Sequence, residues 1–296
     1  MPGDRQPRVM PHPYPEYADG NVLLVEGPWS PAHETTYERE RCIGLRFFQR
    51  GTPRGGYECI EGLPRLMSLE LYTQGRRNLS ILPRLRGLKF LALDATQADP
   101  PLDCEALPHL QALLCDAGDG MSAIERCFSL KFLNLTGFAG AELASLSSLA
   151  ALDRMMLTGA KLQALCGVEG LQQLTSLELV GCRTLEKIAA LSGAPQLGSL
   201  EVTGSRRVTD WHVVGELQTL ERIRLESCGE IPCLPHLDRL ERLREFFLVE
   251  KTVVLDDSLA ALLSAPRLQR ARFAKRRHYS VTWQQVEAAA KSRQGG

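Results

Sequence analysis

A leucine frame recurs ten times along this chain of 296 residues. Its fullest form, Leu-x-x-Leu-x-x-Leu-x-Leu, begins at Leu63, Leu85 and Leu171, and seven further copies keep the spacing with other apolar residues at some positions. The third position of the ten copies falls at residues 69, 91, 113, 133, 155, 177, 200, 223, 246 and 271. Ten copies at intervals of 20 to 25 residues indicate a repetitive architecture.

The frame also predicts how each copy folds. In Leu-x-Leu the two leucines point to one face of a strand and their neighbours point to the other. One such strand cannot bury its apolar face alone, whereas parallel copies stack their leucines into a continuous core. The intervening segments are too short for long helices, so we expect short helical turns or extended returns. The predicted fold is an α/β solenoid with a curved parallel sheet of about 10–12 strands, counted from the frames.

The frame resembles that of the leucine-rich-repeat superfamily over roughly residues 40–275. Three residues after the second strand leucine, the family places an inward-turning Asn, Cys or Thr. Here that position holds Cys182, Ser205 and Cys228 among others, and no copy has Asn. The chain is thus more similar to the cysteine-type and bacterial variants than to the extracellular Asn-ladder type. The resemblance implies a protein that binds a partner protein on its concave sheet face.

The ends of the chain lie outside the clear repeats. Residues 1–20 are rich in proline and are expected to be flexible, and residues 21–50 are expected to form cap strands that include Leu23-x-Val25 and Leu45-x-Phe47. The repeats then cover residues 51–276. Residues 277–296 contain capping residues followed by good helix formers, which predicts a terminal helix that packs Trp283 and Val286 over the last repeat.

The residues that flank the paired leucines are expected on the concave face. In the first half of the chain they form an apolar and aromatic column beside a column of acids. Apolar groups that line up across strands and are rimmed by charge are typical of interface centres. The predicted partner-binding residues are Glu70, Tyr72, Phe90, Asp94, Leu114, Asp116, Phe132 and Met156. The alternative is that the N-terminal segment covers some of these side chains.

The charge distribution suggests a second surface. The net charge is zero, which argues against a general nucleic-acid or membrane-surface binder. The segment from Pro266 onward has eight basic residues and one acid, Glu287, and therefore carries +7. The second basic surface is predicted at Arg222, Arg224, Arg270 and Arg272. Glutamates stand nearby, so cross-strand ion pairing is favoured there, with nucleic-acid or acidic-ligand binding as the alternative function.

Signals for catalysis or metal binding are few. The chain has no Walker loop, no Gly-x-Ser-x-Gly elbow and no His-Glu-x-x-His pair, so we predict neither an enzyme nor a cofactor. The spacing of Cys228, Cys233 and His236 suggests metal ligands, but no fourth ligand is evident and structural cysteines are favoured. Asp210 with His212 suggests acid–base chemistry, but a convex turn with the intervening tryptophan packed inward is favoured.

The composition also bears on the compartment. No apolar run approaches the roughly 20 residues of a membrane helix, and the N-terminus lacks the apolar region of a signal peptide. Several of the nine cysteines occupy leucine positions of the frame, which suits reduced thiols. We therefore expect a cytoplasmic protein without membrane contact, and the oligomeric state stays open.

Overall fold

The computed structural model describes residues 7–48, 57–72, 77–94, 98–117, 121–122 and 124–294. The chain forms two compact units, residues 1–135 and 136–296. Each unit is built on strands of a main sheet that follow one another in chain order, joined by short returns. No helix of the described residues combines the length and apolar character needed to cross a membrane.

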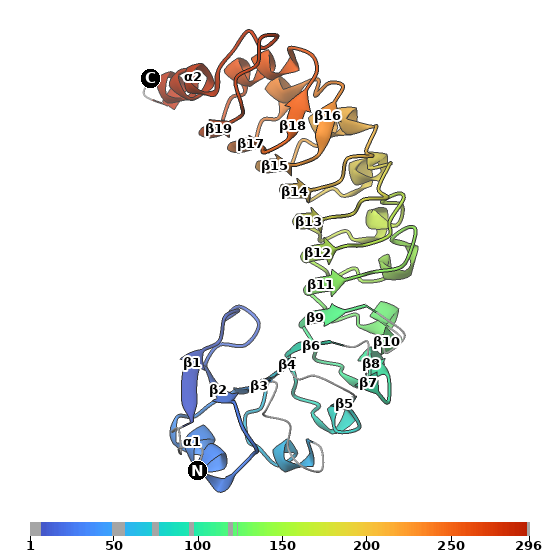
Figure 1. Cartoon of the computed structure of the whole chain (residues 1–296), viewed down its shortest axis with the longest axis vertical. Coiled ribbons are helices and arrows are strands. Elements are labelled where there is room, and N and C mark those ends of the chain that lie inside the picture. Colours follow the sequence, from blue (N-terminus) through green and yellow to red (C-terminus); the bar gives the residue numbers. More distant parts are fainter. Residues whose placement is uncertain are drawn as a thin grey trace. The chain divides into compact units, whose positions relative to one another are not determined.

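In the first unit the main-sheet strands follow the leucine frame (Figure 1). They are β1 (Arg8–Pro11), β2 (Asn21–Val25), β3 (Gly44–Phe48), β4 (Ser68–Tyr72), β6 (Phe90–Asp94), β9 (Ala112–Asp116) and β11 (Phe132–Thr136). β1 pairs antiparallel with β2, and the pairs from β2 through β9 are parallel. The register places Leu45 opposite Leu69 and Leu69 opposite Leu91, so the leucines form columns within the core.

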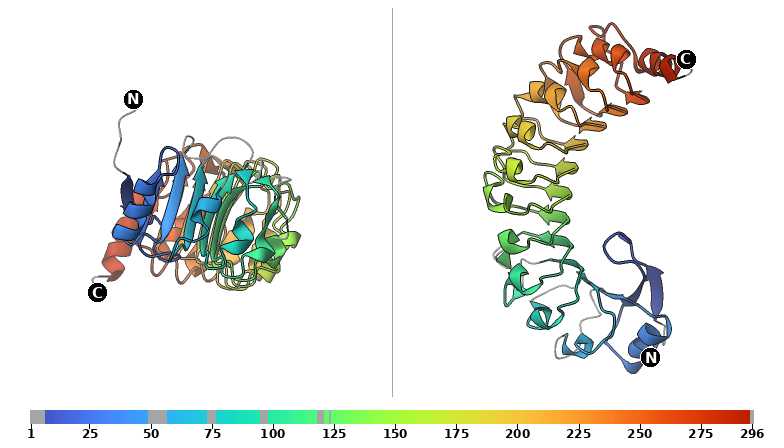
Figure 2. Two further views of the ribbon diagram at one scale, coloured as in Figure 1. Left: turned by 90° about the horizontal axis from the view of Figure 1, so that it is seen from below. Right: turned by 180° about the vertical axis from the view of Figure 1, so that it is seen from behind.

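The returns of the first unit are short, as the spacing predicts. The 3-10 helices are η1 (Glu58–Ile60), η2 (Leu82–Arg84), η4 (Cys104–Ala106) and η5 (Ile124–Arg126). Two small parallel sheets accompany them, formed by β5 (Arg77–Asn78) with β7 (Ala98–Asp99) and by β8 (Leu102–Asp103) with β10 (Met121–Ser122). These elements lie on the side of the unit away from the main-sheet strands (Figure 2).

The second unit repeats this construction. Its main-sheet strands are β12 (Arg154–Thr158), β13 (Ser176–Val180), β14 (Ser199–Thr203), β15 (Arg222–Glu226), β17 (Glu245–Val249) and β19 (Arg270–Arg272), paired in parallel. The 3-10 helices are η6 (Ala144–Leu146), η7 (Val168–Gly170), η8 (Ala189–Gly193), η9 (Trp211–Glu216), η10 (Leu237–Arg239) and η11 (Ser258–Ser264). β16 (Gly229–Ile231) pairs with β18 (Thr252–Val254), and α2 (Trp283–Gln294) ends the unit.

The solenoid prediction is confirmed, and the ends refine it. The terminal helix α2 buries Val286, while Trp283 is half-buried beneath the guanidinium of Arg272, 3.7 Å from its ring centroid. Near the N-terminus an unpredicted helix, α1 (Pro31–Arg39), lies between β2 and β3. Ser30 and Pro31 signal it, because a serine cap followed by proline in the first turn favours helix initiation.

The N-terminal segment differs most from expectation. Of residues 1–20, which were predicted to be flexible, residues 1–6 lie outside the described residues. Residues 8–11 form β1, and residues 12–20, which we call the N-terminal loop, turn back over the main sheet of the first unit. The loop lies on the strand side of that unit (Figure 1). It rejoins β2 at Gly20, whose φ of +146° suits only glycine, and a Cβ there would lie 2.8 Å from Ile43.

Candidate functional site

We call inner face the face of each main sheet whose side chains alternate with the buried leucines. In the first unit this face carries an apolar column that the N-terminal loop covers. Phe90 is fully buried, Phe132 is 8% exposed, and Leu114 is half-buried against the same cluster. Tyr14 stacks on Phe90 with ring centroids 5.4 Å apart, and Tyr17 stacks on Phe132 at 5.8 Å. Two tyrosines of the N-terminal loop therefore cover the apolar column.

His12 fastens the loop to the sheet. Its Nδ1 accepts the backbone N–H of Tyr14 at 3.0 Å, and its Nε2 lies 2.9 Å from the Oγ of Ser68. The ring edge also contacts Phe90, at 4.6 Å between centroids. Because Nδ1 accepts a hydrogen bond, the ring is neutral and its proton resides on Nε2. Burial lowers the pKa of His12, since the charged form would lose hydration.

A buried ion pair lies near His12 and Ser68. Arg46 donates from Nε and Nη2 to the two carboxylate oxygens of Glu70, at 2.9 and 3.0 Å. The Glu70 side chain is only 1% exposed, and it also accepts a hydrogen bond from the Tyr72 hydroxyl at 3.1 Å. Burial, with the negative charge of Glu70, raises the pKa of Tyr72 to about 12. The charge of Glu70 is thus compensated within the chain.

These contacts determine which of the predicted partner-binding residues of the first unit are buried and which remain exposed to solvent. The members that are buried, and so closed to a partner while the loop is in place, are Glu70, Phe90 and Phe132. The members that keep solvent exposure are Tyr72, Leu114 and Asp116. The side chain of Asp94 lies outside the described residues. The alternative of intramolecular cover therefore applies to the centre of the aromatic column.

In the second unit the inner face keeps its side chains in contact with solvent. The partly exposed members of this face include Met156, Glu178, Val180, Glu201, Arg224 and Phe247. The register places Met156 opposite Glu178 and Glu178 opposite Glu201. Burial raises the pKa of Glu178, and the adjacent charge of Glu201 adds to this. The two like charges therefore face each other on an accessible surface.

The four predicted arginines of the basic surface all lie in ion pairs. Arg222 bridges Glu201 at 3.5 Å and Glu245 at 2.7 Å, and Arg270 pairs with the same Glu245. Arg224 pairs with Glu226 at 2.5 Å, and Arg272 pairs with Glu287 of α2 at 2.6 Å. These side chains are 38–61% exposed, so each pair contributes about 1 kcal/mol or less to stability. The cross-strand pairing favoured by the sequence is present for Arg222 and Arg270, whereas Arg224 pairs within its own strand and Arg272 pairs with the terminal helix.

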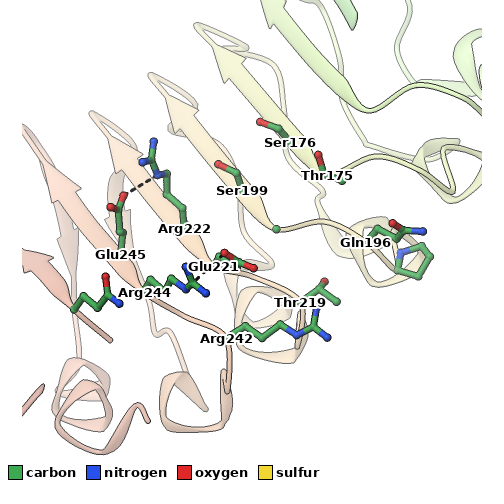
Figure 3. Close-up of a pocket in the computed structure, with 13 residues that line it drawn as sticks. Thr175, Ser176, Gln196, Ser199, Thr219, Glu221, Arg222, Arg242, Arg244 and Glu245 are labelled. Atoms are coloured by element: carbon green, nitrogen blue, oxygen red, sulfur yellow. Dashed lines mark ion pairs between the residues drawn. The ribbon is translucent and has the colours of Figure 1, made fainter. Parts of the chain in front are cut away.

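A groove of about 900 Å³ lies at the edge of the second unit where its strands begin (Figure 3). Small side chains, including Ser176 and Ser199, line one part of it, and Arg222, Arg242 and Arg244 line another. The remaining lining residues are Thr175, Pro195, Gln196, Gly198, Thr219, Glu221, Glu245 and Gln269. The position that opens β13 and β14 with serine opens β15 with arginine, and this change in side-chain size shapes the groove.

The weaker chemical signals have structural explanations. The thiol of Cys228 donates to the carbonyl oxygen of Val202 at 3.2 Å, within the core. Asp210 accepts hydrogen bonds from the backbone N–H groups of residues 188 and 189, and Trp211 is packed inward as predicted. His212 is exposed on the return. No group of three or more potential metal-ligating side chains occurs in the described part of the chain.

Comparison with known proteins bears on the fold. No protein-family model and no curated protein sequence matches the chain. Among solved structures, an internalin from Listeria monocytogenes matches 85% of this chain and 72% of its own, at 19% identity and a TM-score of 0.59. A leucine-rich-repeat protein from Leptospira interrogans matches 85% and 76%, at 14% identity and a TM-score of 0.55. The TLR13–ssRNA13 complex matches 86% of this chain and 47% of its own, at 15% identity and a TM-score of 0.58.

The chain has the leucine-rich-repeat fold. This follows from the parallel strands in register with the leucine frame and from the solved structures that share them. A leucine-rich-repeat sheet presents one row of outward side chains per strand, so its chemistry is set by those rows. The resemblance seen in the sequence is thereby confirmed at the level of the fold.

Proposed function

We propose that this leucine-rich-repeat protein is a non-catalytic binding module that recognises a partner protein through the inner face of its second unit. The observation that carries the proposal is the groove along the starts of β13, β14, β15 and β17, on a face that also presents the partly exposed side chains of Met156, Val180 and Phe247. Interfaces combine accessible apolar anchors with a polar rim and shape complementarity. The inner face of the second unit offers these elements in adjacent rows.

The charges of this face favour a partner of mixed polarity. Glu178 and Glu201 face each other in register; Arg222 pairs with Glu201 and Arg224 lies opposite it, so a basic side chain from a partner would chiefly compensate Glu178. Arg242, beside the groove, is exposed and has no ion-pair partner among the described residues, so it is available to an acidic group. Such an arrangement supports orientation and specificity more than raw affinity.

The contacts predicted from sequence divide between the two units. Met156 belongs to the proposed surface directly, and Tyr72, Leu114 and Asp116 remain proposed contacts on the first unit. The members that join only after the N-terminal loop moves are Glu70, Phe90 and Phe132. Asp94 stays a proposed contact from the sequence alone.

The nucleic-acid alternative has less support. Its predicted residues, Arg222, Arg224, Arg270 and Arg272, lie in ion pairs with glutamates, which lowers the positive field available to phosphates. One similar structure is a complex with ssRNA13, at 15% identity. The exposed Lys275, Arg276 and Arg277 would have to carry this function in place of the paired arginines.

We place the proposed interaction in the cytoplasm. None of the nine cysteines is in a disulfide, and six of them are buried, with Cys115 and Cys127 at leucine positions of the frame. A core that uses thiols as small apolar side chains suits a reducing compartment. Effector, immunity and adaptor roles would each use the proposed surface in the same way.

The experiment is a comparison of two serine-to-tyrosine variants. Ser199→Tyr places a large side chain in the groove, whereas Ser192→Tyr places the same side chain on the exposed surface of η8. Affinity capture from the native host, with quantitative mass spectrometry, should recover a partner with wild type and with Ser192→Tyr but not with Ser199→Tyr. Equal recovery with both variants, each with an unchanged melting temperature, would exclude the groove as the site.

A further inference from the structure

The N-terminal loop contains a turn that places two tyrosines on one side. Residues 14–17 read Tyr-Pro-Glu-Tyr, and the N–H of Tyr17 donates to the carbonyl oxygen of Tyr14 at 3.1 Å. Proline at the second position of a β-turn has its φ already set for that turn. The proline at position 13 restricts the loop further, so it loses little conformational entropy when it docks.

The sheet beneath the turn has a matching shape. Ala112 is opposite Phe90 in the register of β6 and β9, and its small side chain belongs to the same cluster as Phe90 and Phe132. The cluster also contains Tyr17, and Tyr14 packs against it. Tyr14 contacts both phenylalanines, at 5.4 and 5.7 Å between ring centroids. Phe90 and Phe132, with the small side chain of Ala112 in the same cluster, therefore form a surface on which two aromatic rings can each stack.

The loop docks by side chains rather than by strand pairing. It lies after β1 and outside the main sheet, and a side-chain hydrogen bond of His12 with Ser68 joins it to the sheet. Below it, the carboxylate of Glu70 is already paired with Arg46 and Tyr72. If the loop were removed, Glu70 would therefore keep its hydrogen bonds with Arg46 and Tyr72, and no unpaired charge would be left on the exposed face.

We propose that the inner face of the first unit is a recognition surface for a Tyr-Pro-x-Tyr turn of a partner protein, and that the N-terminal loop is its resident intramolecular occupant. A partner segment of this chemistry competes with the loop for Phe90 and Phe132. The loop lowers the apparent affinity of such a partner by the fraction of time for which it occupies the surface. This surface lies on different strands from the groove of the second unit, so either proposal can fail without the other.

Protonation of His12 is expected to weaken docking. Its Nδ1 accepts the N–H of Tyr14, and a proton on that nitrogen would break this hydrogen bond and place a charge against Phe90. The charged groups that act on His12 are Glu70 and Glu16, which favour the proton, and Arg46, which opposes it. Glu70 is committed to Arg46, so burial dominates and docking loses stability as the pH falls below 6.5, the ordinary pKa of histidine.

The test uses a full-length variant in which a two-residue Asn-Gly turn replaces residues 12–20. Pro11 and Asn21 are paired in the β1–β2 register, so this turn can close the hairpin without the loop. The probe is a fluorescent peptide of residues 11–20. It should bind the loop-replaced variant roughly tenfold or more tightly than wild type, in which the resident loop competes. A peptide with Tyr14→Ala and Tyr17→Ala should bind neither protein.

Acid provides the second arm of the test. The affinity of the peptide for the loop-replaced variant should fall between pH 7.5 and pH 5.5, and a peptide with His12→Gln should lose most of this dependence. The proposal is overturned by a folded variant that does not bind the peptide, or by equal binding to wild type. It is also overturned if both the loop-replaced variant and a Tyr14→Ala/Tyr17→Ala variant lose cooperative unfolding, because the loop would then be an obligatory part of the core.

Discussion

The two inner faces of the molecule differ most at the residue that opens each strand. In the first unit β6, β9 and β11 open with Phe90, Ala112 and Phe132, and the chain covers these residues with its own tyrosines. In the second unit β13 and β14 open with Ser176 and Ser199 and the other strands with charged residues, and a groove lies along these strand starts. The buried leucines are in register in both units. The frame therefore determines the fold, whereas the outward positions determine whether a face is covered or open.

The largest difference is expected from removing one aromatic side chain in each unit. Phe90→Ala deletes a fully buried ring and should lower the free energy of unfolding by about 3–5 kcal/mol. Phe247→Ala deletes a ring that is partly exposed to solvent and should cost much less, about 1 kcal/mol. Urea denaturation followed by circular dichroism measures both. Losses of equal size would contradict the contrast between a covered and an open face.

A smaller difference is expected between the ion pairs of the two units. Arg46→Ala leaves the buried carboxylate of Glu70 without its bidentate partner and should cost about 3 kcal/mol. Arg222→Ala breaks exposed pairs with Glu201 and Glu245 and should change stability by about 1 kcal/mol or less. The same denaturation experiment applies. A neutral Arg46→Ala would show that solvent reaches Glu70 and that the loop does not seal this face.

The smallest effect concerns pH. The pKa of His12 is lowered in the folded protein, so the unfolded chain binds its proton first as the pH falls below 6.5. His12 therefore contributes stability above this pH that is lost progressively below it. His12→Gln should make the stability of the protein less dependent on pH between 7.5 and 5.5, as measured by urea denaturation at each pH. Identical pH profiles for wild type and His12→Gln would contradict the claim that neutral His12 holds the N-terminal loop on the sheet.

The sequence predicts the repeats well because their signal is local and periodic. The spacing of Leu69, Leu91 and Leu177 is enough to predict their strands. Extending the same series toward the N-terminus also predicts the strand with Leu45 and Phe47. The helix at residues 31–39 was missed even though Ser30 and Pro31 signal a helix start, because no leucine frame draws attention to this segment.

The covered face could not be predicted in the same way. The sequence places Phe90 and Phe132 correctly on the inner face, but the contact that buries them comes from residues with no period, far away along the chain. A proline-rich segment is usually assigned to flexible chain, and only packing of Tyr14 and Tyr17 against specific partners overrides this tendency. The ion pairing of the arginines was predictable, because acids and bases alternate in neighbouring rows.

The difference between the two inner faces can be measured directly by hydroxyl-radical footprinting, read out by mass spectrometry on phenylalanines alone. Phe247 should be oxidised in the native protein, with the 64% exposed Phe128 as a positive control, while Phe90 and Phe132 should be protected. In the loop-replaced variant, Phe90 and Phe132 should become reactive and Phe247 should not change. Oxidation of Phe90 and Phe132 in the intact protein at the rate of Phe247 would contradict this account.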